Sequence, residues 1–271
     1  MKKVIFPLII LLLVTSCGVD DRTSGFYKSG HEKQLKGDLD GALADYNKVI
    51  ELRPDISGAY DNRGIVREAM GDLNGALADY NKAIELNPNE AAGFYQRGCI
   101  RLNNGEFNGA LSDFTKAISL KSDNTAAYAS AHHGRGIARQ NMGDLDNAIA
   151  DFTKAIEIDP NVALSYFDRG NAKYEKSDFD GAMVDYDHAI KIKPDYFDAY
   201  NNRAIAKQAK GDLDGAIEDF SKVIEINPNL ATAYYNRSVA KETKGDLEGA
   251  RADHKKAYEM NPQHIPPLDQ K

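Results

Sequence analysis

The chain has 271 residues, of which 42% are hydrophobic and 28% are charged, with a formal net charge of −7. This apolar content excludes an intrinsically disordered chain, and the acidic balance disfavours a nucleic-acid-binding protein, which needs basic surface to neutralise phosphates. The length alone allows one or two domains, so the pattern along the chain has to decide the architecture.

The first segment has the features of an export signal. Lys2 and Lys3 precede an apolar run over residues 4–14. As a helix this run is roughly 16 Å long, too short for a hydrocarbon core of about 30 Å. It leads into Val14-Thr15-Ser16-Cys17, which resembles the lipobox of bacterial lipoproteins. The alternatives are a secretory signal that happens to end near a cysteine, or a short helical anchor.

The lipobox resemblance implies a signal peptide over residues 1–16 and a lipidated tether over residues 17–22, with palmitate or related acyl chains on Cys17. Several acyl chains would hold the protein stably on a lipid bilayer. The mature chain would carry 32 basic and 41 acidic residues, a net charge of −9. Gly18 favours the outer membrane over inner-membrane retention, with the periplasmic and surface faces both open. Cys99 would then have no internal disulfide partner.

Seven copies of one pattern follow. It reads Gly-Asp-Leu-Asp-Gly-Ala-Leu-Ala-Asp-Tyr from Gly37 and returns at Gly71, Gly105, Gly143, Ser177, Gly211 and Gly245. Every step is 34 residues except the 38-residue step from Gly105 to Gly143. A fixed period of this size is typical of stacked helical or strand units rather than of one globular core.

Each repeat predicts two helices. In the second repeat, apolar side chains recur at spacings of three and four after residue 72, as on one face of a helix. Gly71 suits the left-handed position that ends the first helix, and Asp72 can cap the second. Pro88 ends the second helix, and Asn89 is placed to cap the next first helix. Each unit is therefore a helical hairpin.

This hairpin pattern is similar to the tetratricopeptide repeat (TPR) family over residues 23–262. The resemblance implies an all-α fold, a right-handed superhelical solenoid of seven antiparallel repeats. Its first helices would line a concave groove that holds peptide segments or partner proteins, without catalysis. The fourth repeat has four extra residues, close to one helical turn, so its first helix should grow by a turn; a loop or bulge is the alternative. Residues 263–271 are expected to form a flexible tail.

An arginine in the first helix and an aspartate in the second recur at the same positions of successive repeats. The family has leucine at the position of this arginine. We expect a ladder of partly buried ion pairs that sets the stacking register. Because the first repeat has Ser29 instead of arginine, we expect each aspartate to pair with the arginine of the following repeat. The alternative is a solvated row of charges. The ladder residues are Arg63, Arg97, Arg135, Arg169, Arg203, Arg237, Asp45, Asp79, Asp113, Asp151, Asp185 and Asp219.

The family resemblance also predicts which side chains face the groove. Aromatic residues in alternate repeats could act as stacking anchors, and asparagines resemble in part the ladder by which some TPR superhelices grip a peptide backbone. For any single aromatic residue, packing between helices is the alternative. The carboxylate clamp of chaperone-binding TPRs is missing at Asp61, Ile65 and Ile205. The predicted groove residues are Tyr27, Asn62, Tyr95, Gln96, Phe167, Asn202, Tyr235 and Asn236.

No motif supports chemistry. The chain has no P-loop, no His-Glu-x-x-His and no Cys-x-x-Cys. His132 and His133 are adjacent, so they diverge on a helix and suit one metal poorly. We therefore expect no enzyme activity, no metal and no cofactor. The expected partner is a protein or peptide of the cell envelope, and a homo-oligomer is possible. The alternative function is binding of a small molecule or glycan in an aromatic groove.

Overall fold

The structure, a computed structural model, describes residues 20–120 and 124–267. Across these ranges the regular elements are fourteen α-helices, without a strand. The chain divides into two compact units, residues 1–144 and residues 145–271. The predicted signal peptide, Cys17 and residues 268–271 lie outside the described residues. No described helix combines the length and apolarity that a membrane span needs.

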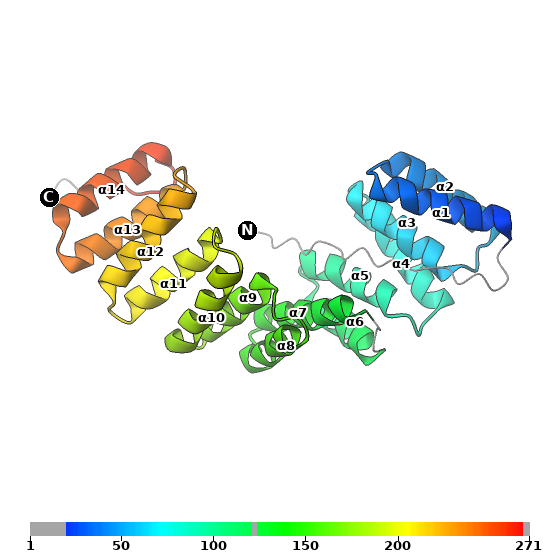
Figure 1. Cartoon of the computed structure of the whole chain (residues 1–271), viewed down its shortest axis with the longest axis horizontal. Helices are drawn as coiled ribbons and strands as arrows, with labels where there is room; N and C mark the ends of the chain where they lie inside the picture. The colour runs from blue at the N-terminus through cyan, green and yellow to red at the C-terminus, as the bar shows by residue number, and fades with distance from the viewer. Residues whose placement is uncertain (1–19, 121–123, 268–271) are drawn as a thin grey trace. The chain divides into compact units, whose positions relative to one another are not determined.

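The helices alternate as first and second members of each repeat (Figure 1). The first helices are α1 (Asp21–Leu35), α3 (Ser57–Ala69), α5 (Ala91–Asn103), α7 (Thr125–Asn141), α9 (Ala163–Glu175), α11 (Phe197–Ala209) and α13 (Ala231–Lys244). The second helices are α2 (Leu39–Leu52), α4 (Leu73–Leu86), α6 (Phe107–Ser119), α8 (Leu145–Ile158), α10 (Phe179–Ile192), α12 (Leu213–Ile226) and α14 (Leu247–Met260). The α7 helix has 17 residues and α5 has 13, so the insertion does extend the helix by one turn.

Local sequence explains where each hairpin turns. Gly71 has φ of +86°, a conformation that costs glycine little, and the Asp72 carboxylate accepts a hydrogen bond from the Gly75 amide at 2.9 Å. The predicted cap at Asn89 is wrong, because the preceding turn carries the chain one residue further. Glu90 occupies the N-cap of α5 without a side-chain cap bond.

The core lies between each first helix and the second helices beside it. Each second helix from α2 to α12 carries one aromatic ring that is at most 1% exposed, and in α2, α4, α6 and α10 this ring lies against a glycine of the first helix. A Cβ atom built on Gly64 would lie 2.6 Å from the Tyr80 ring. Close approach of the two helices therefore requires glycine there. The buried rings are Tyr46, Tyr80, Phe114, Phe152, Tyr186 and Phe220.

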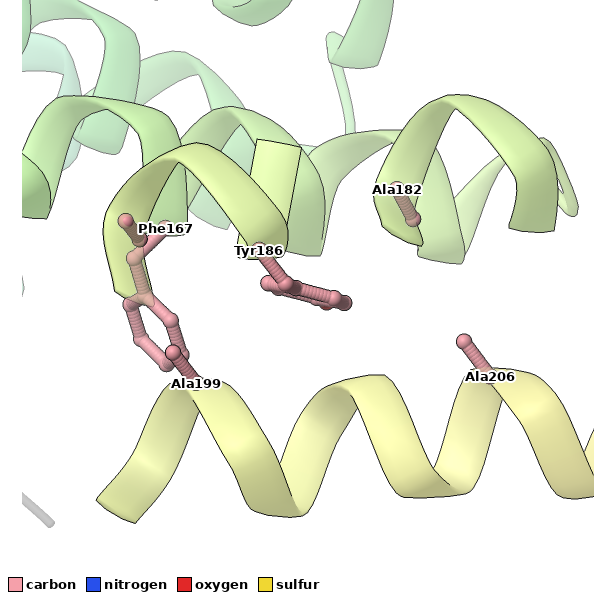
Figure 2. Packing of buried hydrophobic residues seen from close by; sticks show 6 residues of the cluster. Phe167, Ala182, Tyr186, Ala199 and Ala206 are labelled. Carbon is pink, nitrogen blue, oxygen red and sulfur yellow. The ribbon is translucent and has the colours of Figure 1, made fainter. Parts of the chain in front are cut away.

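Neighbouring repeats within each unit share this core. Figure 2 shows the rings of Phe167 on α9 and Tyr186 on α10 directed toward α11, which presents Ala199 and Ala206. The first helices also contact one another in series, α1 with α3, α3 with α5, α5 with α7 and α9 with α11. One hairpin therefore buries its apolar face only when the next one stacks on it.

The end of the array is partly covered by residues that follow α14. Ile265 is 5% exposed, and the His254 Nε2 atom lies 2.8 Å from the Pro266 carbonyl oxygen. The flexible tail over residues 263–271 stays a prediction, with Ile265 and Pro266 in contact with the array. Ile265 is an apolar side chain within reach of the last helix, and its burial accounts for this contact.

Candidate partner-binding surfaces

The ion-pair ladder forms within repeats rather than between them. Arg63 on α3 donates from Nε and Nη2 to the two carboxylate oxygens of Asp79 on α4, at 3.0 and 2.6 Å. The same fork joins Arg97 to Asp113, Arg169 to Asp185, Arg203 to Asp219 and Arg237 to Asp253. The predicted pairing with the following repeat is therefore wrong, because the two helices of one hairpin hold these side chains closest together.

The third arginine nitrogen supplies the link between repeats. Arg63 Nη1 donates to Asn47 Oδ1 at 2.8 Å, and Arg97 Nη1 donates to Asn81 Oδ1 at 2.6 Å. In the second unit, Arg169 reaches Thr153 at 3.1 Å. Each acceptor lies on the second helix of the preceding repeat, two residues after its aspartate. One planar guanidinium thus fixes its own hairpin and touches the previous one.

A second cation completes each site and was not predicted. Four residues after the arginine, Arg67 and Lys173 approach Asp79 and Asp185, both at 2.8 Å. In the first repeat, Asp45 instead accepts from Ser29 at 2.6 Å and from Lys33 at 2.7 Å. These aspartate side chains are at most 11% exposed, which is incompatible with a solvated row of charges. Arg135 lies in the first unit and Asp151 lies in the second.

Most of the predicted aromatic anchors are packed between helices. Tyr27 packs edge-on against Tyr46 with ring centroids 5.9 Å apart, and Tyr95 packs against Phe114 at the same distance. Phe167 is 7% exposed and contacts two other rings. Tyr235 is partly exposed beside His254. The first three therefore present no open stacking surface, and the aromatic glycan site loses its basis.

Asparagine amides form a connected row on the first helices of the second unit. Asn236 on α13 donates to Asn201 on α11 at 3.3 Å, and Asn201 donates to Asn202 at 3.1 Å. Asn202 donates to Asn171 on α9 at 2.8 Å, and Asn171 also accepts from the Tyr186 hydroxyl at 2.9 Å. All four asparagines are partly exposed. Asn171 was not predicted, because it lies one helical turn beyond the positions that the family resemblance identified.

These bonds orient the amides without using their full capacity. A side-chain amide has two N–H donors and an oxygen with two lone pairs. Asn201 and Asn202 each donate once and accept once within the row. Within the described residues, hydrogen-bond donors and acceptors of these amides therefore remain unused along α9, α11 and α13.

The corresponding first-helix residues of the first unit are buried. Asn62 is buried and donates to the Tyr27 hydroxyl at 2.8 Å. Asp61 is 2% exposed, and Gln96 on the neighbouring α5 is 1% exposed. Burial, followed by the charges of Glu90 and Asp79, raises the Asp61 pKa well above its usual range. Asn62 and Gln96, which the sequence placed in the groove, are therefore buried, in contrast to the partly exposed asparagine row.

Nothing in the described parts of the chain assembles into a metal centre. No three histidine, cysteine, aspartate or glutamate side chains within them lie close enough to share an ion. Cys99 is fully buried, and this burial raises the pKa of its thiol to about 12, far from a reactive thiolate.

Family profiles match along the chain. One described as TPR repeat matches residues 69–105 and 170–211. Two further profiles are described as tetratricopeptide repeat. One of them matches residues 129–162 and 197–230, and the other matches residues 24–56, 91–124 and 231–264. Together these matches cover more than half of the chain. No curated protein matches it significantly.

Solved structures with the same fold include TPR proteins from several sources. A tetratricopeptide repeat protein from Parabacteroides merdae is 21% identical, with 89% of this chain and 94% of that chain covered and a TM-score of 0.65. YrrB, described as a TPR protein with an unusual peptide-binding site, is 23% identical. The match covers 69% of this chain and 95% of YrrB, with a TM-score of 0.59. MamA is 28% identical, and the match covers 64% of this chain and 92% of MamA, with a TM-score of 0.55.

Proposed function

This chain belongs to the tetratricopeptide repeat family, a family of protein–protein interaction scaffolds, and we propose that it is a non-catalytic adaptor for a partner protein. The adaptor holds an extended peptide segment of that partner on its first helices. The observation that carries this proposal is the row of linked, partly exposed amides of Asn171, Asn201, Asn202 and Asn236. Such a row binds main-chain groups, which every peptide offers.

The row is pre-ordered before any peptide arrives. Because each amide is already held by its neighbour, binding loses less side-chain entropy than ordering free asparagines would. Each side-chain hydrogen bond to a peptide contributes about 0.5–1.5 kcal/mol. Removing two of the four amides should therefore weaken binding roughly tenfold, since about 1.4 kcal/mol corresponds to a factor of ten.

The test is a peptide selection followed by titration. A library of random dodecapeptides is selected on the full-length protein, and the enriched peptides are titrated calorimetrically. The double variant Asn202→Ala with Asn236→Ala should lose about tenfold in affinity for the selected peptides that contain no lysine or arginine. Asn229→Ala, at an exposed loop position, is the matched control and should bind as the wild type does. Equal affinities of the double variant and wild type would refute the proposed site.

We further propose that the adaptor is anchored to the bacterial outer membrane by lipid on Cys17. The support is the charged start, the short apolar run and the Val14-Thr15-Ser16-Cys17 motif. Cells expressing the wild type should incorporate labelled palmitate into this protein, and Cys17→Ser should abolish that label and release the protein from the membrane fraction. Retention of label in Cys17→Ser would contradict the anchor and leave the adaptor proposal intact.

A further inference from the structure

Asp61 stands apart from the buried aspartates of the ion-pair ladder. The ladder aspartates within each unit accept hydrogen bonds from cationic or hydroxyl groups, as Asp79 does from Arg63 and Arg67 and Asp45 does from Ser29 and Lys33. Asp61 is 2% exposed, yet no group in the described residues donates a hydrogen bond to its Oδ1 atom. An ionised carboxylate buried in this way is costly unless a cation pairs with it.

The sequence around Asp61 shows how this position differs from its counterparts. Tyr27 and Phe167 occupy the same position in their repeats, and their rings lie in core clusters with Ala59 and Ala199 of the following repeat. In the second repeat the ring is replaced by the smaller carboxylate of Asp61. The facing alanine is replaced by Gly93, where an added Cβ would lie 3.1 Å from Asp61 Oδ1. An apolar pair has thus become a polar site with less side-chain volume.

The surroundings of this carboxylate are negative. Glu90, at the start of α5, is partly exposed, and its charge is the second cause, after burial, of the raised Asp61 pKa. Glu90 Oε2 accepts from the Ser57 hydroxyl at 3.2 Å and from the Asn87 amide at 3.0 Å. Both donors are neutral, so neither cancels the charge of Glu90.

We propose that Asp61 and Glu90 form a recognition site for a cationic side chain, lysine or arginine, of a peptide segment held on the first unit. Glu90 lies nearer to solvent and Asp61 lies deeper, which matches a long flexible side chain with its charge at the tip. Two carboxylates are fewer than the ligands that a dedicated metal site needs. This inference rests on the proposed adaptor function and names the peptide chemistry that the first unit selects.

The test uses pairs of synthetic peptides with the full-length protein. From the dodecapeptide selection, a peptide enriched in lysine or arginine is compared with its counterpart in which that residue is glutamine. We expect the cationic peptide to bind at least tenfold more tightly. Asp61→Asn should reduce this preference to less than twofold, while circular dichroism reports that its helices are intact. Asp40→Asn removes the same charge at an exposed position in the same unit and should leave the preference unchanged.

The outcomes separate this inference from the adaptor proposal. A peptide whose affinity does not depend on Asn202 and Asn236, but which binds equally well with glutamine in place of the cation, would overturn the cation site alone. A preference that persists in Asp61→Asn would also overturn it. If no peptide binds, both proposals fail. Both proposals are supported if Asp61→Asn removes only the preference for the cationic peptide and if the Asn202 and Asn236 double variant weakens only the peptides that contain no lysine or arginine.

Discussion

Replacing Asp185 with asparagine tests the ladder in the second unit. This carboxylate is 0% exposed and accepts hydrogen bonds from Arg169 Nε and Nη2 at 2.9 and 2.6 Å. Lys173 Nζ lies 2.8 Å from Asp185 Oδ2, the oxygen that also accepts from Arg169 Nε. Asparagine keeps the shape but removes the charge, so two cations lose their shared partner between the helices.

The expected cost follows from the burial of the three groups. Removing one partner of a buried ion pair costs about 3–5 kcal/mol. The arginine and lysine side chains are 16% and 21% exposed, so water can replace part of what they lose. Asparagine also retains one acceptor oxygen. We therefore expect a loss of about 2–4 kcal/mol in the free energy of unfolding, or about 5–15 °C in the melting temperature for a chain of this length.

Urea unfolding followed by circular dichroism measures this loss, and hydrogen exchange locates it. Because a repeat array need not unfold in one step, exchange of the α9 and α10 amides is the sharper readout. Asp187→Asn is the matched control on the same helix. Asp187 pairs with Arg203 but is 57% exposed, so its loss should cost at most about 1 kcal/mol. Equal effects of the two variants, or a loss below about 0.5 kcal/mol at Asp185, would refute a structural role for the buried pairs.

Three further outcomes are expected. Gly64→Ala should destabilise the protein by about 1–3 kcal/mol, because the added Cβ would lie 2.6 Å from the Tyr80 ring. Gly25→Ala, with no atom within 4 Å of the added Cβ, should stabilise α1 by up to about 1 kcal/mol. Melting curves of both variants measure these two effects. Cys99 should resist a thiol reagent such as dithionitrobenzoate until urea unfolds the protein, and rapid labelling of the native protein would contradict its burial. Burial raises the pKa of Asp253, but hydrogen bonds from Arg237 and Lys241 outweigh burial and lower that pKa below 3.8. The stability that Asp253 contributes is therefore present above pH 3.8 and is lost as the pH falls further. In an acid titration, Asp253→Asn should lose stability less steeply than the wild type does.

The repeat period by itself determined the secondary structure. The hairpin turn depends on two local signals, Gly71 with φ of +86° and the capping aspartate Asp72. Both act without information from other repeats. The four-residue insertion likewise produced a longer helix because four residues nearly complete a turn and preserve the faces of α7. Fold class and repeat number could therefore be predicted from the chain alone.

The identity of contacts across the period could not be predicted in this way. Arg63 is in phase with Asp45 and with Asp79, which are one repeat apart, so periodicity cannot distinguish the two partners. Only the packing of α3 against α4 placed Asp79 within 2.6 Å of the guanidinium. The same packing decided which inner residues are available, burying Phe167 against neighbouring rings and leaving Asn202 partly exposed. Backbone conformation follows from neighbours in sequence, whereas partner choice and burial depend on how successive hairpins stack.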